Sequence, residues 1–227
     1  MYSLVLLNGG SGTRMRADRP KQFLTVNGLP ILVYSLVAAD AVPELDQIVL
    51  NYPEGWREEV EGIVRDYAIR TPVDYVAAGA TRQDSVAAAL ELCRNDDVVL
   101  HEAARPLVRS ADFSRLIRSP ERNVSYMVPI PFTVAPVDPA TRAVTGYLDR
   151  ARLRNVQLPQ KFALADLAAA HAFAATQGHG FTEDASMLAA AGIPVHYIDG
   201  QDTNIKVTTP TDIHLAVSLL HGETEGD

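Results

Sequence analysis

The sequence predicts an α/β fold in which a mostly parallel, twisted sheet is flanked by helices, and three observations support it. Short apolar runs alternate with helix-length segments along most of the chain, as in successive βα units. The first run leads directly into a glycine-rich turn. The composition of the 227 residues, 47% hydrophobic and 21% charged, is that of a globular domain with a sizeable core.

The individual elements follow from this alternation. Strands are predicted at 4–7, 47–50, 73–76, 98–100, 125–129 and 195–198. Helices are predicted at 30–40, 55–67, 82–93, 111–118, 164–176, 182–191 and 210–220. Several of them begin with a capping residue or a proline, namely Pro30, Asp112, Thr182 and Pro210.

Residues 131–159 break this rhythm. They contain four prolines, short β-like pieces and a turn candidate at 138–141. We expect an excursion or arm here. The predicted organisation is one domain over 1–222 that carries this arm, followed by a frayed tail at 223–227.

Charge and cysteine content exclude several classes of function. A formal net charge of -8 argues against a broad nucleic-acid surface, so an anionic ligand must meet a local basic pocket. The single cysteine, Cys93, excludes an intrachain disulfide framework, and its predicted helical position favours a buried structural thiol over a nucleophile. The chain has no apolar run long enough for a membrane span and no signal-peptide pattern at its start, so we expect a cytoplasmic protein.

The glycine turn at 8–13 is the first candidate site. Glycine lets backbone N–H groups approach a phosphate without a side-chain clash. Arg14 and Lys21 add two cations within a few residues, which suits a triphosphate. The pattern is neither a P-loop nor a complete dinucleotide fingerprint, and an ordinary βα turn is the alternative for the glycines alone.

Two further segments follow predicted strands. Residues 79–86 begin a helix, where free N–H groups and short polar side chains either read a base edge or form a solvated first turn.

Glu102 falls at the carboxyl end of the strand at 98–100, where open α/β sheets bind ligands. A carboxylate beside a triphosphate is expected to hold Mg²⁺. His101 is expected to be a structural hydrogen-bonding residue and Arg105 an ion-pair partner.

Three motifs lie in the last third of the chain. Residues 158–162 suggest a turn or helix cap when taken alone. Glu183 and Asp184 precede a predicted helix, where their charges suit the macrodipole, so a capping role is expected. Lys206 lies in a β-like run beside a helix start.

Taken in order, these motifs resemble those of the nucleotidyltransferase superfamily, specifically its cytidylyltransferases for methylerythritol phosphate and ribitol phosphate. The resemblance extends to about residue 215, and the matching segments are Gly-Gly-x-Gly-Thr-Arg-Met at 9–15, Pro-Lys-Gln-Phe at 20–23, Gly-x-x-Arg-x-x-Ser at 79–85, Ala-Ala-Arg-Pro at 103–106, Pro-Gln-x-Phe at 159–162 and Asn-x-Lys-x-Thr at 204–208. It implies a Rossmann-like nucleotidyltransferase fold with a protruding β-arm. It also implies a magnesium-dependent enzyme that transfers CMP from CTP to a small phosphorylated polyol and releases pyrophosphate.

The same resemblance implies roles for individual residues. Arg14, Lys21 and Lys206 are the implied catalytic residues and Glu102 the implied metal ligand. The implied nucleotide-binding residues are Asn8, Gly9, Gly10, Gly12, Thr13, Gly79, Arg82, Ser85 and Ala103. A homodimer built through the 131–159 arm would bring Thr133 and Arg150 of one subunit to the acceptor phosphate in the other, where Lys206 also binds it.

Departures from the family pattern leave the acceptor open. The family motifs have Asp at the position of Glu102, usually Asp at that of Phe132, and often Asp at that of Thr203. Methylerythritol 4-phosphate is the first expectation, ribitol 5-phosphate the second and a phosphonate the third. A sugar-1-phosphate pyrophosphorylase would share the glycine loop without the Arg82 and Lys206 motifs, and a CTP-binding paralogue without turnover is a further alternative. A Rossmann dehydrogenase is disfavoured because the glycine fingerprint is incomplete.

Overall fold

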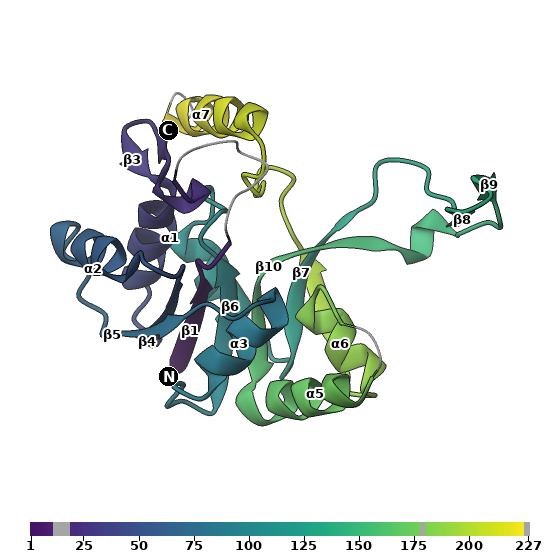
Figure 1. Ribbon diagram of the computed structural model, residues 1–227, viewed down its shortest axis with the longest axis horizontal. Helices are drawn as coiled ribbons and strands as arrows, with labels where there is room; N and C mark the ends of the chain where they lie inside the picture. The colour runs from purple at the N-terminus through teal and green to yellow at the C-terminus, as the bar shows by residue number, and fades with distance from the viewer. Residues whose placement is uncertain (11–18, 178–179, 225–227) are drawn as a thin grey trace.

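The computed structural model describes residues 1–10, 19–177 and 180–224, and a seven-stranded sheet forms its centre (Figure 1). The strand order is β11-β7-β10-β6-β1-β4-β5. The strands are β1 Tyr2–Leu7, β4 Leu45–Tyr52, β5 Val73–Ala77, β6 Asp97–Glu102, β7 Val124–Pro129, β10 Arg154–Ala163 and β11 His196–Asp199. All neighbouring pairs are parallel except the two that β10 makes. The predicted mostly parallel α/β fold is therefore confirmed.

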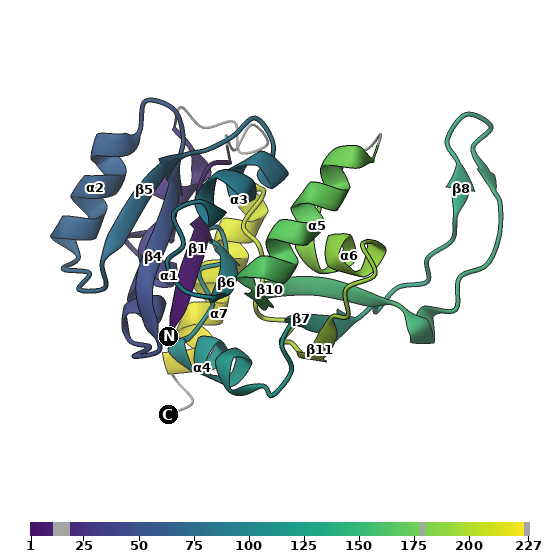
Figure 2. The same ribbon diagram turned by 90° about the horizontal axis from the view of Figure 1, so that it is seen from below.

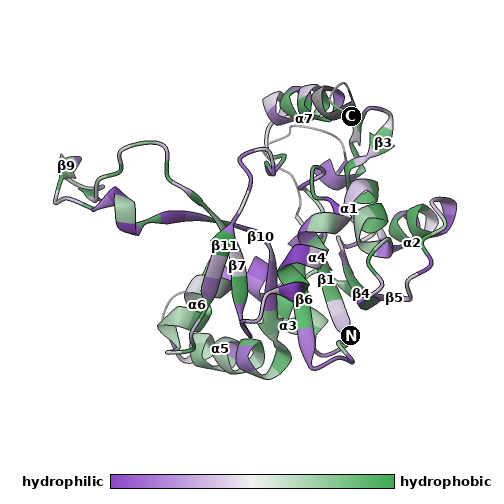
Figure 3. Ribbon diagram, turned by 180° about the vertical axis from the view of Figure 1, so that it is seen from behind, coloured by the Kyte–Doolittle hydropathy of each residue, from purple (hydrophilic) through white to green (hydrophobic). Residues whose placement is uncertain are grey.

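Helices cover both faces of this sheet, because successive side chains of a strand point to opposite faces. Leu4 and Leu6 of β1 belong to a core cluster with α1, α2 and α4, whereas Val5 belongs to a second cluster with α3, α5 and α6. The helices are α1 Ile31–Asp40, α2 Arg57–Asp66, α3 Arg82–Leu90, α4 Ser110–Arg118, α5 Leu164–Thr176, α6 Asp184–Ala190 and α7 Pro210–Thr224. Figure 3 shows the hydrophobic residues gathered in the central strands.

The remaining elements are short and lie in the connections between these helices and strands. They are the 3-10 turns η2 Lys21–Phe23 and η3 Arg150–Arg152 and the short strands β2 Thr25–Val26, β3 Leu29–Pro30, β8 Val137–Asp138 and β9 Ala143–Val144. Val26, Ile31, Val207 and Ala216 form a third apolar cluster that joins β2 to α7. This cluster holds Val207, in the segment before α7, beside β2 and the start of α1.

Two of the four residues predicted to begin helices, Asp112 and Thr182, do not stand at the observed starts, and α2 begins at Arg57 rather than at residue 55. The N-cap of α4 is Arg109, and Asp112 instead occupies the third helical position, from which it accepts a hydrogen bond from Arg109 N at 2.9 Å. The N-cap of α6 is Glu183 rather than Thr182. In α4 the Asp112 carboxylate accepts from the N–H of the cap residue, and in α6 the cap residue Glu183 itself accepts from the first free N–H groups of the helix.

The ends of two helices also differ from the prediction. Helix α3 ends at Leu90, so Cys93 lies just beyond it, where its thiol donates to Ala89 O at 3.4 Å and burial raises its pKa to about 12. A thiol with that pKa is protonated at neutral pH, as expected of a structural cysteine. Helix α7 continues to Thr224, so the first two residues of the predicted 223–227 tail are helical, and 225–227 lie outside the described residues.

Strand β10 is the one large element that the sequence prediction missed. Its residues Gln157, Gln160 and Lys161 are buried although they are polar, and they hide the apolar alternation of a strand. The register shifts between Gln157 and Gln160, where Pro159 has no N–H for the ladder. Residues 154–159, predicted as the end of the arm, therefore belong to the central sheet.

The arm itself runs from the end of β7 to the start of β10 and extends away from the rest of the molecule (Figure 1, Figure 2). Its tip is the β8–β9 hairpin, with Val137 paired to Val144 and Asp138 to Ala143. The predicted turn at 138–141 is present, since Asp138 Oδ1 accepts hydrogen bonds from the N–H groups of Ala140 at 2.8 Å and Thr141 at 3.4 Å. None of the helices in the described ranges has the length and apolar character needed to cross a bilayer.

Candidate active site

A cavity of about 450 Å³ opens at the carboxyl ends of β1, β5 and β6. Parallel strands place their carboxyl ends at one edge of the sheet, so segments distant in sequence meet there. Leu7 ends β1 and residues 8–10 follow it, residues 79–82 follow β5, and Glu102 ends β6 with residues 103–104 after it. Lys21, Gln22, Ser85 and Lys206 complete the lining.

Most of the residues predicted for the site line this cavity. They are Asn8, Gly9, Gly10, Lys21, Gly79, Arg82, Ser85, Glu102, Ala103 and Lys206. Gly12, Thr13 and Arg14 lie outside the described residues. Thr133 and Arg150 are exposed residues of the arm and do not line the cavity of their own chain.

The turn after β1 brings backbone close to the cavity. A Cβ added to Gly9 would lie 2.2 Å from Ala78 Cβ, so only glycine fits there. Among the described residues, nothing lies within 4 Å of a Cβ added to Gly10. The side-chain amide atoms of Asn8 are buried and have no hydrogen-bond partner in the same part of the chain, while Gln22, which the sequence prediction missed, donates to Asn8 O.

The start of α3 forms a second wall. Thr81 and Asp84 form a capping box, in which Asp84 N donates to Thr81 Oγ1 at 3.1 Å. Ser85 Oγ donates to Thr81 O at 2.9 Å and accepts from Gly79 N at 3.0 Å. A Cβ on Gly79 would lie 2.4 Å from Asp84 Cβ. The Ser85 hydroxyl therefore shapes this turn, and its predicted contact with a base stays a prediction.

Glu102 lies at the centre of a group of cations. Its Oε1 lies 2.9 Å from Lys206 Nζ and 3.4 Å from Arg82 Nε, and its Oε2 lies 3.4 Å from Arg105 Nε. Burial alone would raise the pKa of this carboxyl, but Lys206, Arg105 and Arg82 outweigh it and lower the pKa to about 2. Glu102 is therefore ionised, and Arg105 is an ion-pair partner as expected.

Lys21 connects the first turn to the last motif. It is 8% exposed, and its Nζ donates to Val207 O at 2.8 Å. Val207 is adjacent to Lys206, and Arg105 Nη1 donates to Asn204 O at 2.8 Å in the same segment. These bonds fix residues 204–207 as an irregular segment beside the cavity, although the sequence suggested a β-like run.

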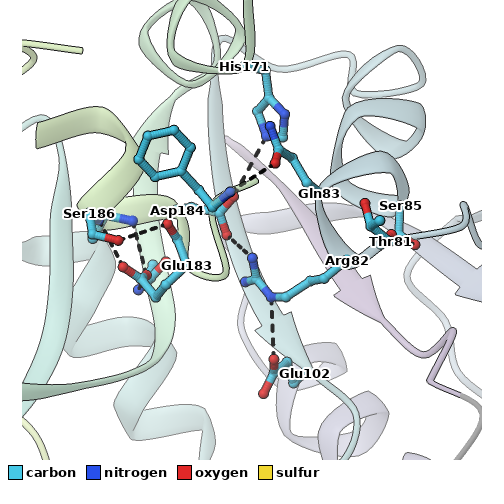
Figure 4. A network of polar contacts seen from close by, with 12 residues as sticks. Thr81, Arg82, Gln83, Ser85, Glu102, His171, Glu183, Asp184 and Ser186 are labelled. Carbon is cyan, nitrogen blue, oxygen red and sulfur yellow. Dashed lines mark hydrogen bonds and ion pairs between the residues drawn. The ribbon is translucent and has the colours of Figure 1, made fainter. Parts of the chain in front are cut away.

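Arg82 reaches a second carboxylate on the opposite side from Glu102 (Figure 4). Its Nη1 lies 2.5 Å from Asp184 Oδ2, and His171 Nε2 lies 3.6 Å from Asp184 Oδ1. Glu183 caps α6 as predicted, by accepting from Ala185 N and Ser186 N, but Asp184 is an ion-pair partner of Arg82 rather than a cap. No sequence signal identified this pair, because its members lie far apart in the chain.

His101 is a structural residue, as expected. It is fully buried, and its ring packs edge-on against Phe113 at 5.3 Å between centroids. Burial lowers its pKa to about 3, with the charge of Arg105 acting in the same direction, so the ring is neutral. A hydrogen bond with the backbone of Arg105 opposes this shift without reversing it.

The residues present fit Mg²⁺ only together with a bound phosphate. No group of three or more His, Cys, Asp or Glu side chains able to hold a metal occurs among the described residues. Glu102 offers one ionised carboxylate at the cavity, whose Oε2 has only a long contact of 3.4 Å, with Arg105 Nε, among the described residues. Mg²⁺ commonly takes one or two protein carboxylates plus substrate phosphates and water, which matches this donor set.

The chemistry of the lining favours a multiply charged anion. Lys21, Arg82 and Lys206 face the cavity with Glu102 as the one carboxylate among its described lining residues. The local charge is thus positive although the whole chain carries -8. The volume lies within the usual range for small-molecule sites.

Known proteins resemble this chain over almost its full length. The family model described as 2-C-methyl-D-erythritol 4-phosphate cytidylyltransferase matches residues 2–222. A protein of that name from Bacillus cytotoxicus is 38% identical over 224 residues, which are 97% of this chain and 98% of the relative.

Solved structures agree with the fold. The crystal structure of the Thermus thermophilus protein of that name is 29% identical, with a TM-score of 0.76 over 97% of this chain and all of the other. The 4-diphosphocytidyl-2C-methyl-D-erythritol synthase of Anaerococcus prevotii, at 24% identity, has a TM-score of 0.85 over 97% of this chain and 96% of its own. The Rossmann-like nucleotidyltransferase fold expected from the motifs is therefore confirmed.

Proposed function

The chain belongs to the 2-C-methyl-D-erythritol 4-phosphate cytidylyltransferase family, and from this membership we propose how its cavity performs the reaction. It is a CTP-dependent nucleotidyltransferase that transfers CMP to 2-C-methyl-D-erythritol 4-phosphate. This acceptor is the first of the three that the sequence left open. We propose that the enzyme acts in the cytoplasm, where CTP is available.

One observation carries the proposal for the site: Lys21, Arg82 and Lys206 converge with Glu102 on one cavity at the carboxyl edge of the parallel strands. These residues come from four separate segments of the chain. A triphosphate and an acceptor phosphate bring several negative charges together, and that requires cations on more than one side. The convergence supplies them.

The proposed chemical step is an in-line displacement. An anionic oxygen of the acceptor phosphate attacks the α-phosphorus of CTP, a new P–O bond forms, and the bond from the α-phosphorus to the bridging oxygen breaks. The electron pair leaves with pyrophosphate. The attacking oxygen is already ionised at neutral pH, so no side chain has to remove a proton. Positioning and charge neutralisation therefore account for the catalysis.

Each cation has a proposed part in this step. Lys21, together with Arg14 outside the described residues, would neutralise charge on the reacting phosphates and on pyrophosphate. Lys206 would hold the acceptor phosphate, and Arg82 would bind the nucleotide. Gly9 and Gly10 would let backbone N–H groups approach the triphosphate, with Asn8, Gly79, Ser85 and Ala103 forming the walls around it.

Glu102 would hold Mg²⁺ together with phosphate oxygens of CTP, and the ion would supply further neutralisation of the triphosphate charge. Glu102 already bears its negative charge, because its lowered pKa keeps it ionised throughout the neutral range. The carboxylate also holds Lys206 at 2.9 Å, which keeps that ammonium at the rim of the cavity.

We propose a homodimer in which the arm of each subunit completes the partner's site. The arm exposes several large apolar side chains, which is costly in water unless a partner covers them. They are Phe132, Val137, Val144, Tyr147 and Leu148. Thr133 and Arg150 lie near the base of this arm, and Arg150 Nη1 donates to Pro131 O at 3.0 Å, which fixes the side chain close to Thr133.

Pyrophosphate release tests the reaction directly. The purified chain is incubated with Mg²⁺, CTP and either 2-C-methyl-D-erythritol 4-phosphate, ribitol 5-phosphate, glycerol 3-phosphate or a small phosphonate. ATP, GTP and UTP serve as nucleotide controls. We expect turnover with CTP and the methylerythritol acceptor, and none without acceptor. A higher rate with ribitol 5-phosphate or with UTP would overturn the assignment.

A further inference from the structure

The guanidinium of Arg82 is held between two carboxylates from different parts of the chain (Figure 4). Its Nε donates to Glu102 Oε1 at 3.4 Å, at the end of β6. Its Nη1 lies 2.5 Å from Asp184 Oδ2, in the first turn of α6. Two anchors on two of its three nitrogens fix both the position and the plane of a guanidinium.

Asp184 has no capping role that would explain its burial. Glu183 already satisfies the start of α6, because its carboxylate accepts from Ala185 N at 3.0 Å and from Ser186 N at 2.8 Å. The Asp184 side chain is 2% exposed. Placing a carboxylate there costs free energy unless it is paired, so its partners are the reason for its position.

The charge of Asp184 is maintained by these partners. Burial acts to raise its pKa, but the contacts with His171 and Arg82 prevail and lower the pKa. His171 comes from α5 and lies behind Asp184, with its Nε2 3.6 Å from Asp184 Oδ1. The series His171, Asp184, Arg82 and Glu102 therefore runs from α5 to the cavity without a gap.

The two carboxylates occupy Nε and Nη1 of Arg82, so the third guanidinium nitrogen, Nη2, remains. Nη2 is buried and has no hydrogen-bond partner in the part of the chain that the structure describes. A buried donor without an acceptor is costly, so a bound ligand that offers an acceptor gains affinity there. Arg82 lines the cavity, so Nη2 is the nitrogen of its guanidinium that stays available for a ligand bound there.

We propose that Asp184, backed by His171, is a positioning residue that holds Arg82 so that Nη2 donates to CTP. The inference rests on the proposed function for the identity of the nucleotide. Asp184 does not line the cavity, so it acts through Arg82 and not on the substrate. Its removal should then weaken CTP binding more than it slows the chemical step or weakens acceptor binding.

Asp184→Asn tests this, because it removes the charge and keeps the shape. The control is Asp166→Asn on α5, which makes the same change in an Asp–Arg pair away from the cavity, with Arg122 at 3.0 Å. The readouts are KM for CTP, KM for the acceptor, kcat, CTP affinity by calorimetry with Mg²⁺, and the midpoint of thermal unfolding. Asp184→Glu, which keeps a carboxylate, tests for rescue.

For Asp184→Asn we expect KM and Kd for CTP to rise about tenfold, with kcat and the acceptor KM changed less than about threefold. Asp166→Asn should leave CTP binding unchanged, and Asp184→Glu should recover most of the affinity. A folded Asp184→Asn protein with wild-type CTP affinity would overturn the proposal. Equal losses in kcat, both KM values and unfolding midpoint would do so too, since they indicate a structural role alone.

If Asp184→Asn does not fold, His171→Gln is the variant that tests the proposal. We expect His171→Gln to raise KM for CTP about threefold and to leave the unfolding midpoint unchanged. Unchanged CTP binding by this variant would reject the proposal. Failure of the proposed function would appear separately, as absence of CTP-dependent pyrophosphate release by the wild-type chain. Calorimetry with CTP would still compare the variants in that case, and a wild-type chain that does not bind CTP would reject both.

Discussion

Two buried lysines show how position decides what a residue does. Lys21 is 8% exposed and Lys161 is 4% exposed, yet Lys21 lines the cavity and Lys161 does not. Lys161 Nζ donates to Ser119 O at 2.6 Å and to Ile117 O at 3.4 Å, at the carboxyl end of α4. A cation at the end of a helix stabilises the free carbonyl groups there. Lys161 is therefore a stability residue and Lys21 a candidate catalytic one.

Replacing each of these lysines with methionine should separate the two roles. Lys21→Met should reduce kcat/KM about a hundredfold or more, since a cation on the reacting phosphates is lost. It should also lower the free energy of unfolding, because Val207 O loses its buried donor. Lys161→Met should lower the free energy of unfolding by about 1–3 kcal/mol, because buried carbonyls lose their donor, and should leave kcat/KM near wild type. Steady-state kinetics and urea unfolding of both variants check this. A fully active Lys21→Met would exclude Lys21 from catalysis.

The buried ring of His101 predicts how stability depends on pH. Burial lowers its pKa to about 3, whereas an unfolded histidine has a pKa near 6.5. Between these values the unfolded chain binds a proton that the folded chain does not, so stability falls as the pH is lowered from about 6.5. One such proton corresponds to about 1.4 kcal/mol per pH unit.

His101→Gln should remove this contribution. Urea unfolding with EDTA at pH values from 7 to 5 would give a flatter pH dependence for the variant, by about 1.4 kcal/mol per pH unit below pH 6. The other histidines are common to both proteins and cancel in the comparison. Parallel curves for the two proteins would mean that His101 titrates normally in the folded state.

At the scale of elements, the turn after β1 combines a packing requirement with a binding surface. Gly9 packs against Ala78, the residue after β5, so a side chain there would push two neighbouring segments apart. Gly10 lines the cavity, and no atom of the described residues lies within 4 Å of a Cβ added to it. Gly9 is therefore required for packing, whereas Gly10 is proposed to be required for ligand binding.

The alanine variants of these two glycines should behave differently. Gly9→Ala should lower the free energy of unfolding by about 1–3 kcal/mol, since its Cβ would lie 2.2 Å from Ala78 Cβ. Gly10→Ala should keep wild-type stability but raise KM for CTP about tenfold, because a Cβ would hold the triphosphate away from the backbone N–H groups. Thermal unfolding and KM measurements check both. Unchanged CTP kinetics in Gly10→Ala would contradict phosphate binding by this turn.

At the scale of the whole molecule, the arm is the part that the single chain does not explain. It leaves the sheet between β7 and β10 and makes no part of the cavity of its own chain among the described residues. Tyr147 is 84% exposed and Phe132 76% exposed, which is unusual for side chains of this size. A second copy of the chain would cover these side chains and receive Arg150 at its site.

Complementation between two inactive variants tests this arrangement. Lys21→Met lacks a cation of the cavity, and Arg150→Ala lacks the proposed arm contact. If each site combines Lys21 of one subunit with Arg150 of the other, a mixed dimer contains one intact site. Unfolding and refolding an equal mixture should then restore about a quarter of wild-type activity by random pairing. No recovery in mixed dimers isolated with two affinity tags would show that the arm does not act in trans.

The sequence alone predicted a large part of this molecule. Among the described residues, six of the seven central strands and all seven α-helices were located, because apolar periodicity is a local property of the chain. The sequence also predicted Lys21, Glu102 and Lys206 as site residues, from the chemistry of their motifs and from the family resemblance. The tertiary structure brings these three to one cavity.

Only the tertiary structure decided the rest, because it depends on contacts between distant residues. Strand β10 is buried by its neighbours β6 and β7 despite its polar sequence, so no local pattern identified it. Asp184 looked like a helix cap until the fold placed it against Arg82. The three cations around Glu102 come from positions up to 104 residues away. Local sequence determines which elements form and which chemical groups they carry, whereas the packing of the whole chain determines which groups meet.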